Sequence, residues 1–166
     1  MVDVEVQKAI RTGVKKGNLD EVKHLIGNDK ERLNLMTPFG TWLHVAASAG
    51  QLHIVEWLIA NGIDVNKYGG TSGSGPLHRA SSDGHLEIVR RLLELGAMLD
   101  VSEPERNPLF GAIYGGHTQV AKLLIDNGID ISVKYTGENM TNIDALAFAK
   151  EWGRTDIVAL LEAKAT

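Results

Sequence analysis

The 166-residue sequence contains no cysteine. Without thiols the chain can form neither a disulfide nor a thiolate zinc site, and it has no cysteine nucleophile. The absence leaves the redox compartment undecided. Aromatic residues are also scarce, at 5% of the chain, so each of the three Trp, three Tyr and three Phe is a candidate for a specific role.

Long apolar runs and clusters of basic residues are missing as well. No stretch approaches the roughly 18 apolar residues that a membrane-spanning helix needs. The first residues, Met-Val-Asp-Val-Glu-Val-Gln-Lys, contain neither the basic nor the apolar part of a signal peptide. We therefore expect a cytoplasmic protein without membrane contact. The formal net charge of −4 argues against nucleic-acid binding, which needs clustered cations to neutralise phosphates.

One phrase recurs along the chain: a glycine, a short polar pair and then an apolar helical segment. Two copies are Gly50-Gln51-Leu52-His53-Ile54-Val55 and Gly84-His85-Leu86-Glu87-Ile88-Val89. The glycines that open the phrase stand at positions 17, 50, 84, 116 and 153, so the spacings are 33, 34, 32 and 37 residues. A nearly fixed period of this length predicts one helical unit repeated along the chain.

Each unit reads as two helices. The first is short and rich in Ala, Ser and Gly, which allows neighbouring helices to approach closely. The second carries apolar residues at helical spacing, such as Ile54, Val55 and Leu58, which form a stripe that faces the core. No unit could bury this apolar face alone, so the units must stack.

The segment Thr41-Trp42-Leu43-His44-Val45-Ala46-Ala47 resembles the ankyrin-repeat signature T-P-L-H-x-A-A, and the phrase that begins at Gly84 matches the second-helix phrase of that family. The resemblance extends over nearly the whole chain. It implies an all-α ankyrin-repeat solenoid of stacked helix–loop–helix units joined by hairpin-like fingers.

By this register the chain is a single ankyrin-repeat domain of five units. We expect an N-terminal cap unit, three fuller units and a C-terminal cap unit, at residues 1–33, 34–67, 68–100, 101–133 and 134–166. Polar residues replace signature residues in the two end units, as the outer face of a terminal repeat requires.

The signature is incomplete after the second unit, which alone keeps both its Thr and its His. Gly75 lacks the Thr hydroxyl of the third unit, and Phe110 replaces the His of the fourth with an apolar ring. Two fingers also differ: residues 68–75 are rich in Gly and Ser, and residues 132–140 account for the longest spacing. An insertion in a solenoid often lies on the binding face, although a tolerated surface insertion explains it equally well.

Residues that could carry chemistry do not form a site in the sequence. The six His include no His-x-x-x-His or His-x-x-Glu-His spacing, so a zinc site has no ligand framework. The resemblance implies a structural hydrogen bond for His44 and His78, which stand at the signature position. Gly73-Ser74-Gly75 lies in a predicted finger without a preceding strand, unlike a nucleophile elbow. We therefore predict no enzyme, no catalytic residue, no cofactor and no metal.

The resemblance implies a recognition surface on the concave face, formed by the ends of the first helices and by the fingers. Carried over residue by residue, the register gives these candidate partner-binding residues: Lys15, Phe39, Ser48, Tyr68, Arg79, Ser82, Asp83, Glu105, Arg106, Tyr114, Tyr135 and Trp152. Tyr114 and Trp152 belong to neighbouring units and could together hold one side chain of a partner. Packing of Trp152 against the C-terminal cap is an equal alternative.

The function that follows is non-catalytic binding of a protein partner, of unknown identity, by a monomer. One alternative is an immunity-type or regulatory inhibitor, whose acidic surface would cover a basic enzyme. An alternative of another class is an enzyme or small-ligand binder, which would need a deep pocket with converging titratable groups in the groove. A third is a structural spacer that self-associates through an end unit, which dimer formation would reveal.

Overall fold

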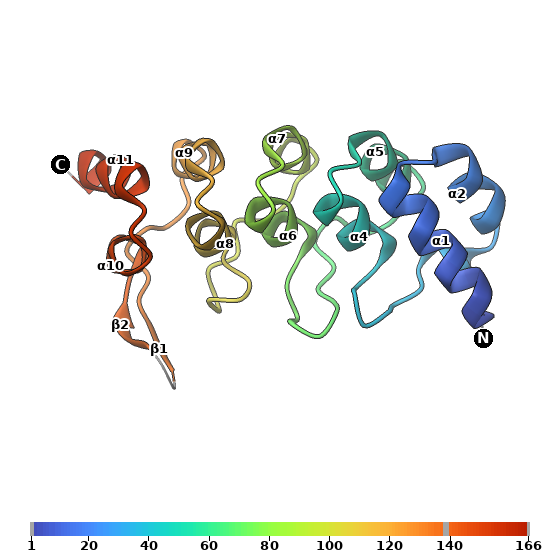
Figure 1. The fold of residues 1–166 in the computed structure, drawn as a ribbon, viewed down its shortest axis with the longest axis horizontal. Helices are drawn as coiled ribbons and strands as arrows, with labels where there is room; N and C mark the ends of the chain where they lie inside the picture. Colours follow the sequence, from blue (N-terminus) through green and yellow to red (C-terminus); the bar gives the residue numbers. More distant parts are fainter. Residues whose placement is uncertain (1, 138–139, 166) are drawn as a thin grey trace.

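The computed structural model describes residues 2–137 and 140–165. Within these residues five helix pairs follow one another in sequence order and stack into an elongated rod, with the N- and C-termini at opposite ends (Figure 1). The pairs are α1 (Val4–Lys16) with α2 (Leu19–Ile26), α4 (Trp42–Ser48) with α5 (Leu52–Ala60), α6 (Pro76–Ser82) with α7 (Leu86–Glu94), α8 (Pro108–Gly115) with α9 (Thr118–Asp126), and α10 (Ala145–Glu151) with α11 (Thr155–Ala165). The predicted all-α solenoid is confirmed.

The first helices form one row of the rod and the second helices form the other, and the fingers project from the row of first helices (Figure 1). The short helix α3 (Lys30–Leu33), which the sequence did not predict, follows α2. The strands β1 (Tyr135–Gly137) and β2 (Met140–Ile143) pair in antiparallel fashion in the predicted insertion. Its residues 138–139 lie outside the described residues. The hairpin makes the last finger longer than the others (Figure 1).

The core is a continuous apolar spine between the two rows. Ile10, Leu43, Leu77 and Leu109 occupy equivalent places in the first four first helices, and each is buried. Leu146 occupies the fifth such place, in α10 at the end of the rod (Figure 1), and is only half-buried. Burial of each such side chain stabilises the stack by about 1.5–3 kcal/mol.

A repeated hydrogen bond joins each unit to the one before it. The residue that follows the repeat glycine donates to a main-chain carbonyl near the end of the preceding first helix: Gln51 Nε2 to Lys15 O at 3.2 Å, His85 Nε2 to Ser48 O at 2.8 Å, His117 Nε2 to Ser82 O at 3.0 Å and Arg154 Nη2 to Tyr114 O at 2.6 Å.

The repeat glycine is required for this bond as well as for the turn. Gly84 has a φ of +77°, and a Cβ placed on it would lie 2.4 Å from Nδ1 of His117. Only glycine adopts this left-handed conformation without strain. Any larger residue would also displace the ring that joins the two units.

Candidate functional site

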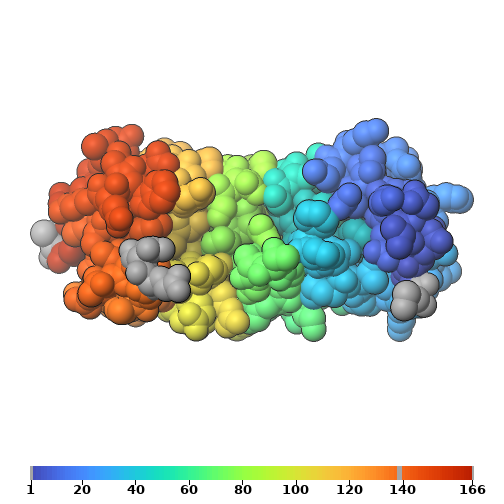
Figure 2. Space-filling view, turned by 60° about the horizontal axis from the view of Figure 1, so that its bottom comes forward, coloured from blue at the N-terminus to red at the C-terminus, as the bar shows by residue number. Residues whose placement is uncertain are grey.

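The row of first helices and the fingers form one face, and the units follow each other along it without interruption (Figure 2). Seven large apolar side chains are exposed among the described residues, and four of the seven are aromatic. These four are Phe39, Tyr68, Tyr114 and Trp152, all of which belong to the predicted concave face. Exposed aromatic side chains gathered on one face are typical of an interaction surface.

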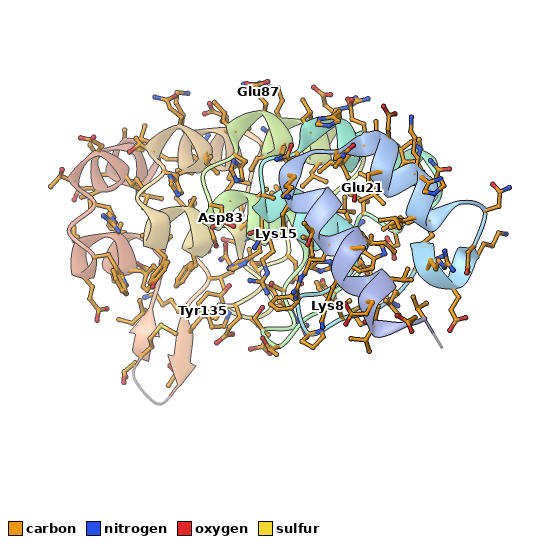
Figure 3. All side chains as sticks on the ribbon, turned by 45° about the vertical axis from the view of Figure 1, so that its right-hand side comes forward. Lys8, Lys15, Glu21, Asp83, Glu87 and Tyr135 are labelled. Atoms are coloured by element: carbon orange, nitrogen blue, oxygen red, sulfur yellow. The ribbon has the colours of Figure 1, made fainter. Side chains whose placement is uncertain are left out.

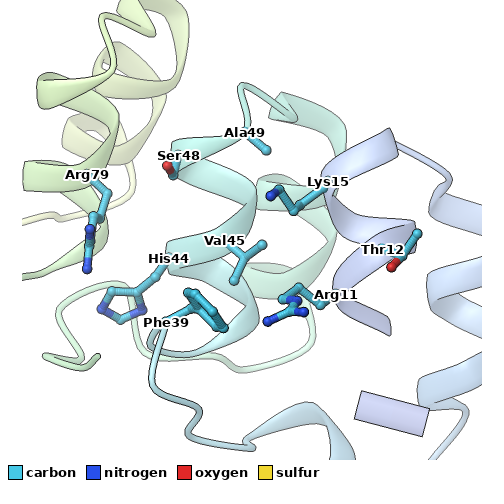
Figure 4. Close-up of a pocket in the computed structure, with 9 residues that line it drawn as sticks. All are labelled: Arg11, Thr12, Lys15, Phe39, His44, Val45, Ser48, Ala49 and Arg79. Carbon is cyan, nitrogen blue, oxygen red and sulfur yellow. The ribbon is translucent and has the colours of Figure 1, made fainter. Parts of the chain in front are cut away.

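A hollow of about 430 Å³ opens on this face between α1, α4 and α6 (Figure 4). We call it the basic hollow, and its lining residues are Arg11, Thr12, Lys15, Phe39, His44, Val45, Ser48, Ala49 and Arg79. Lys15, Phe39, Ser48 and Arg79 were among the predicted residues, and the structure brings these four together. The lining contains three cations and no carboxylate.

The three cations of the basic hollow are free of ion pairs with any described residue. The guanidinium of Arg11 lies over the ring of Phe39, 4.6 Å from its centroid, in a cation–π contact. Arg79 Nη2 donates to Ser72 Oγ at 3.0 Å, while its Nε is buried and has no hydrogen-bond partner. The hollow therefore presents positive charge on a chain whose net charge is negative.

His44 forms the inner wall of the basic hollow and is buried. Its Nδ1 accepts from the main-chain N–H of Thr41 at 3.1 Å and lies 2.9 Å from Thr41 Oγ1. Its Nε2 therefore carries the proton and donates to Ser74 O at 3.0 Å. The pKa of His44 is lowered to about 4, mainly by burial; the bond to Ser74 acts against this shift and the charge of Arg79 acts with it. His44 is thus a neutral link between two units, not a poised base.

His78 stands at the same position one unit later but lacks this arrangement. Gly75 has no hydroxyl, and Nδ1 of His78 is buried without a hydrogen-bond partner. Burial lowers the pKa of His78 to about 4 as well. Across residues 2–137 and 140–165, no group of three or more His, Asp or Glu side chains is placed to hold a metal ion.

Tyr114 and Trp152 meet edge to face at the other end of the concave face. Their ring centroids are 4.7 Å apart and their planes are inclined by 70°. Tyr114 is 57% exposed and Trp152 is 43% exposed, so the pair is available to a partner. The sequence register correctly made them neighbours.

The exposed pair is the outer end of an aromatic column, which consists of Tyr114, Trp152, Phe148, Phe110 and Tyr135. The ring centroids of Trp152 and Phe148 are 6.0 Å apart. Phe148 in turn stacks on Phe110, with ring centroids 4.5 Å apart and an interplanar angle of 14°. Phe110 meets Tyr135 edge to face at 5.0 Å. The ring that replaces the signature His thus connects the surface pair to the core.

The prediction that Tyr135 lies on the partner-binding surface is wrong. Its side chain is 7% exposed. Its hydroxyl donates to Val101 O at 2.7 Å and accepts from Asn107 Nδ2 at 3.0 Å. Burial raises the pKa of Tyr135. The side chain folds inward because Phe110 offers it an apolar partner, while the main chain and Asn107 satisfy its hydroxyl.

Tyr68 and Arg106 form a link between neighbouring fingers. The guanidinium of Arg106 lies over the ring of Tyr68, 4.6 Å from its centroid. The hydroxyl of Tyr68 donates to the carboxylate of Asp100, and this bond raises the pKa of Tyr68. The two predicted residues therefore contact each other, and they lie outside the basic hollow.

Three other predicted residues lie along the first helices or fingers. Asp83 is exposed, and its Oδ2 accepts from Ser48 Oγ at 2.6 Å, which joins α4 to α6. Ser82 is half-buried, and Glu105 is exposed.

Sequence reasoning missed Arg11 and Thr12 in the basic hollow. The available signal was the spacing of Arg11 and Lys15, because residues four apart share one face of a helix.

No helix in the described part of the chain is long and apolar enough to cross a membrane.

Comparison with known proteins agrees with the stacked helix pairs of the structure. The family described as "Ankyrin repeats (3 copies)" matches residues 10–103 and 67–135. The chain is 36% identical over 93 residues to protein phosphatase 1 regulatory subunit 27 of Mus musculus, covering 55% of this chain and 60% of the relative. It is 35% identical over 114 residues to the probable 26S proteasome regulatory subunit p28 of Saccharomyces cerevisiae, covering 66% of this chain and 50% of the relative. The chain thus spans 60% or less of the length of these relatives.

Proposed function

Because this chain belongs to the ankyrin-repeat family, whose members are generally protein-interaction modules and typically non-catalytic, we propose that it binds a protein partner on its concave face. The observation that carries the proposal is the distribution of aromatic side chains: every exposed aromatic residue in the described part of the chain belongs to the predicted concave face. Trp, Tyr and Arg side chains supply most of the binding energy in many interfaces.

The concave face offers two areas to a partner. One is the exposed pair of Tyr114 and Trp152, whose apolar rings can be covered by a partner's side chain. The other is the basic hollow near the N-terminal end of the rod. A partner that contacts both would lie along the row of first helices across several units, as an extended interface requires.

An enzyme site in the basic hollow is disfavoured by its composition. Acid–base chemistry generally needs a carboxylate or a poised histidine, whereas the lining contains no carboxylate and His44 has a pKa of about 4 with both ring nitrogens engaged. Regulation of an enzyme partner is the second candidate function. It is favoured by two relatives whose names describe regulatory subunits.

Affinity capture with the full chain tests the proposal. We expect tagged protein to retain a specific partner from extracts of its native host, and the double substitution Tyr114→Ala with Trp152→Ala to reduce that retention about tenfold or more, since each hot-spot truncation costs about 2 kcal/mol or more. A matched control combines Glu87→Ala with Gln119→Ala on the row of second helices, from which Glu87 projects (Figure 3).

Quantitative mass spectrometry measures the retained proteins, and far-UV circular dichroism verifies that each variant is folded. Equal retention by the parent chain, the aromatic variant and the control would refute the proposal. An assay of the captured partner's activity with and without the chain then separates simple binding from regulation.

A further inference from the structure

We propose that the basic hollow binds an oxyanion, a carboxylate or a phosphate, carried by an acidic segment of the protein partner. The inference rests on the proposed function and assigns a chemistry to one part of the concave face. It reverses the charge expected from the composition, because a chain of net charge −4 presents cations at this site.

The three cations come from two helices and reach one space. Arg11 and Lys15 project from α1, and Arg79 projects from α6, toward the region in front of α4 (Figure 4). Arg11 and Lys15 are four residues apart, which places them on one face of α1.

Six cations elsewhere among the described residues form ion pairs, whereas the three cations of the basic hollow share one space without such a pair. Lys8 pairs with Glu5 at 2.8 Å, and Arg91 pairs with Glu56 at 2.9 Å. No described carboxylate plays this part for Arg11, Lys15 or Arg79. Like charges that share a hollow without a counter-ion raise its local potential, which attracts an anionic group.

Arg79 is held in place without being fully bonded. Its Nη2 donates to Ser72, while its Nε is covered by protein and unpartnered. A guanidinium is well suited to a carboxylate or phosphate. Because Nε is covered by protein, an incoming oxyanion would bind the Nη groups of Arg79.

An apolar area adjoins the cations and indicates what flanks the acidic group. A second hollow of about 250 Å³ shares Arg11 and Phe39 with the basic hollow. Its lining includes Val4, which is 60% exposed, and Phe39, which is 53% exposed. A segment with an apolar residue close to its acidic residue would fill both hollows, with Arg11 at their border.

A protein segment fits these features better than a nucleic acid. A nucleic-acid strand needs an extended basic surface to follow its phosphates. Outside the basic hollow the concave face carries Asp83, Glu105 and Glu151 as exposed acids, which would repel a polyanion.

Peptide selection on the immobilised full chain tests the inference. From a random library of 12-residue peptides we expect binders that share an Asp or Glu at one position with an apolar residue nearby. The double substitution Arg11→Gln with Lys15→Gln should weaken them about tenfold to a hundredfold, the effect of losing a hydrogen bond to a charged group. The double substitution Lys23→Gln with Arg90→Gln makes the same change in net charge on the row of second helices and should alter affinity less than twofold.

Synthetic versions of one selected peptide distinguish the two sources of the oxyanion. Phosphoserine in place of the acidic residue should retain or increase affinity, and Gln should lose it. Fluorescence anisotropy at two salt concentrations measures the affinity of each peptide, because a contact between charges weakens as the salt concentration rises.

Three results would overturn the inference. The first is a set of binders that share no acidic residue, the second is equal weakening of acidic binders by both double variants, and the third is tighter binding of a 12-nucleotide single-stranded RNA than of every peptide. If binders without an acidic residue still depend on Tyr114 and Trp152, the proposed function survives and this inference alone fails. If no substitution on the concave face changes the affinity of any binder, the proposed function fails with it.

Discussion

Replacing Gly75 by threonine should stabilise the fold, because it restores a bond that the third unit lacks. Gly75 is the N-cap of α6, with φ of −93° and ψ of 168°, a conformation open to every residue type. A Cβ at this place would lie 3.8 Å from two ring atoms of Tyr68, an ordinary contact. One unit earlier, Thr41 has nearly the same dihedral angles, and its Oγ1 lies 2.9 Å from Nδ1 of His44. The new hydroxyl should reach Nδ1 of His78, which is now buried and unpartnered.

Two contributions set the magnitude. Removing glycine lowers the conformational entropy of the unfolded chain and stabilises by about 0.4–1 kcal/mol. Giving a buried acceptor its partner adds about 1 kcal/mol. We therefore expect the free energy of unfolding to rise by about 1.5–2 kcal/mol for Gly75→Thr and by about 0.4–1 kcal/mol for Gly75→Ala, which carries only the first contribution.

Urea unfolding at pH 7.5, followed by far-UV circular dichroism, measures both variants. The slope of the free energy against urea should stay constant, which shows that the two variants expose the same surface on unfolding. The same pair of substitutions in a His78→Leu background isolates the hydroxyl–imidazole bond as a double-mutant cycle. If Gly75→Thr is no more stable than Gly75→Ala, or if its advantage persists without His78, the hydroxyl does not pair as argued.

Two further predictions concern stability. His44 and His78 have folded-state pKa values of about 4 against about 6.5 when unfolded, so between these values the unfolded chain binds more protons. Their contribution is therefore present above pH 6.5 and is lost as the pH falls toward 4; at pH 5 it should be smaller by roughly 2 kcal/mol per histidine. Urea midpoints at pH 7.5 and pH 5 measure this, and equal midpoints would contradict it. Tyr135→Phe should cost about 1–3 kcal/mol by leaving Asn107 and the Val101 carbonyl without the hydroxyl. It should leave partner capture unchanged, whereas reduced capture by a stable variant would return Tyr135 to the binding surface.

The fold could be predicted from the sequence because its signals are local and repeated. The glycines of the recurring phrase mark a backbone turn that few other residues permit, and the apolar spacing of residues such as Ile54 and Leu58 fixes which side of a helix is buried. A repeat also predicts contacts between residues that are distant in sequence. The register placed Tyr114 and Trp152 in neighbouring units, although equivalent positions of these two units are 37 residues apart.

The site could be predicted only where the register holds. Lys15 and Ser48 fall at matching places of successive first helices, and Arg79 lies on the next first helix at the place that Val45 occupies in α4, so their meeting in one hollow follows from stacking. Tyr135 lies in an insertion that has no counterpart in the other units, and the direction of its side chain depends on Phe110 and Asn107, which are distant in sequence. A local sequence pattern does not predict contacts between residues that are so distant in sequence.

The aromatic column gives the surface pair a stiffness that an isolated pair would lack. Trp152 packs against Phe148, and through it against the buried Phe110, so these contacts restrict the rotamers open to its side chain. A ring that is preorganised in this way loses little conformational entropy on complex formation. Shortening the buried Phe110 is therefore expected to loosen the packing of Trp152, two rings away, and with it any contact that a partner makes there under the proposed function.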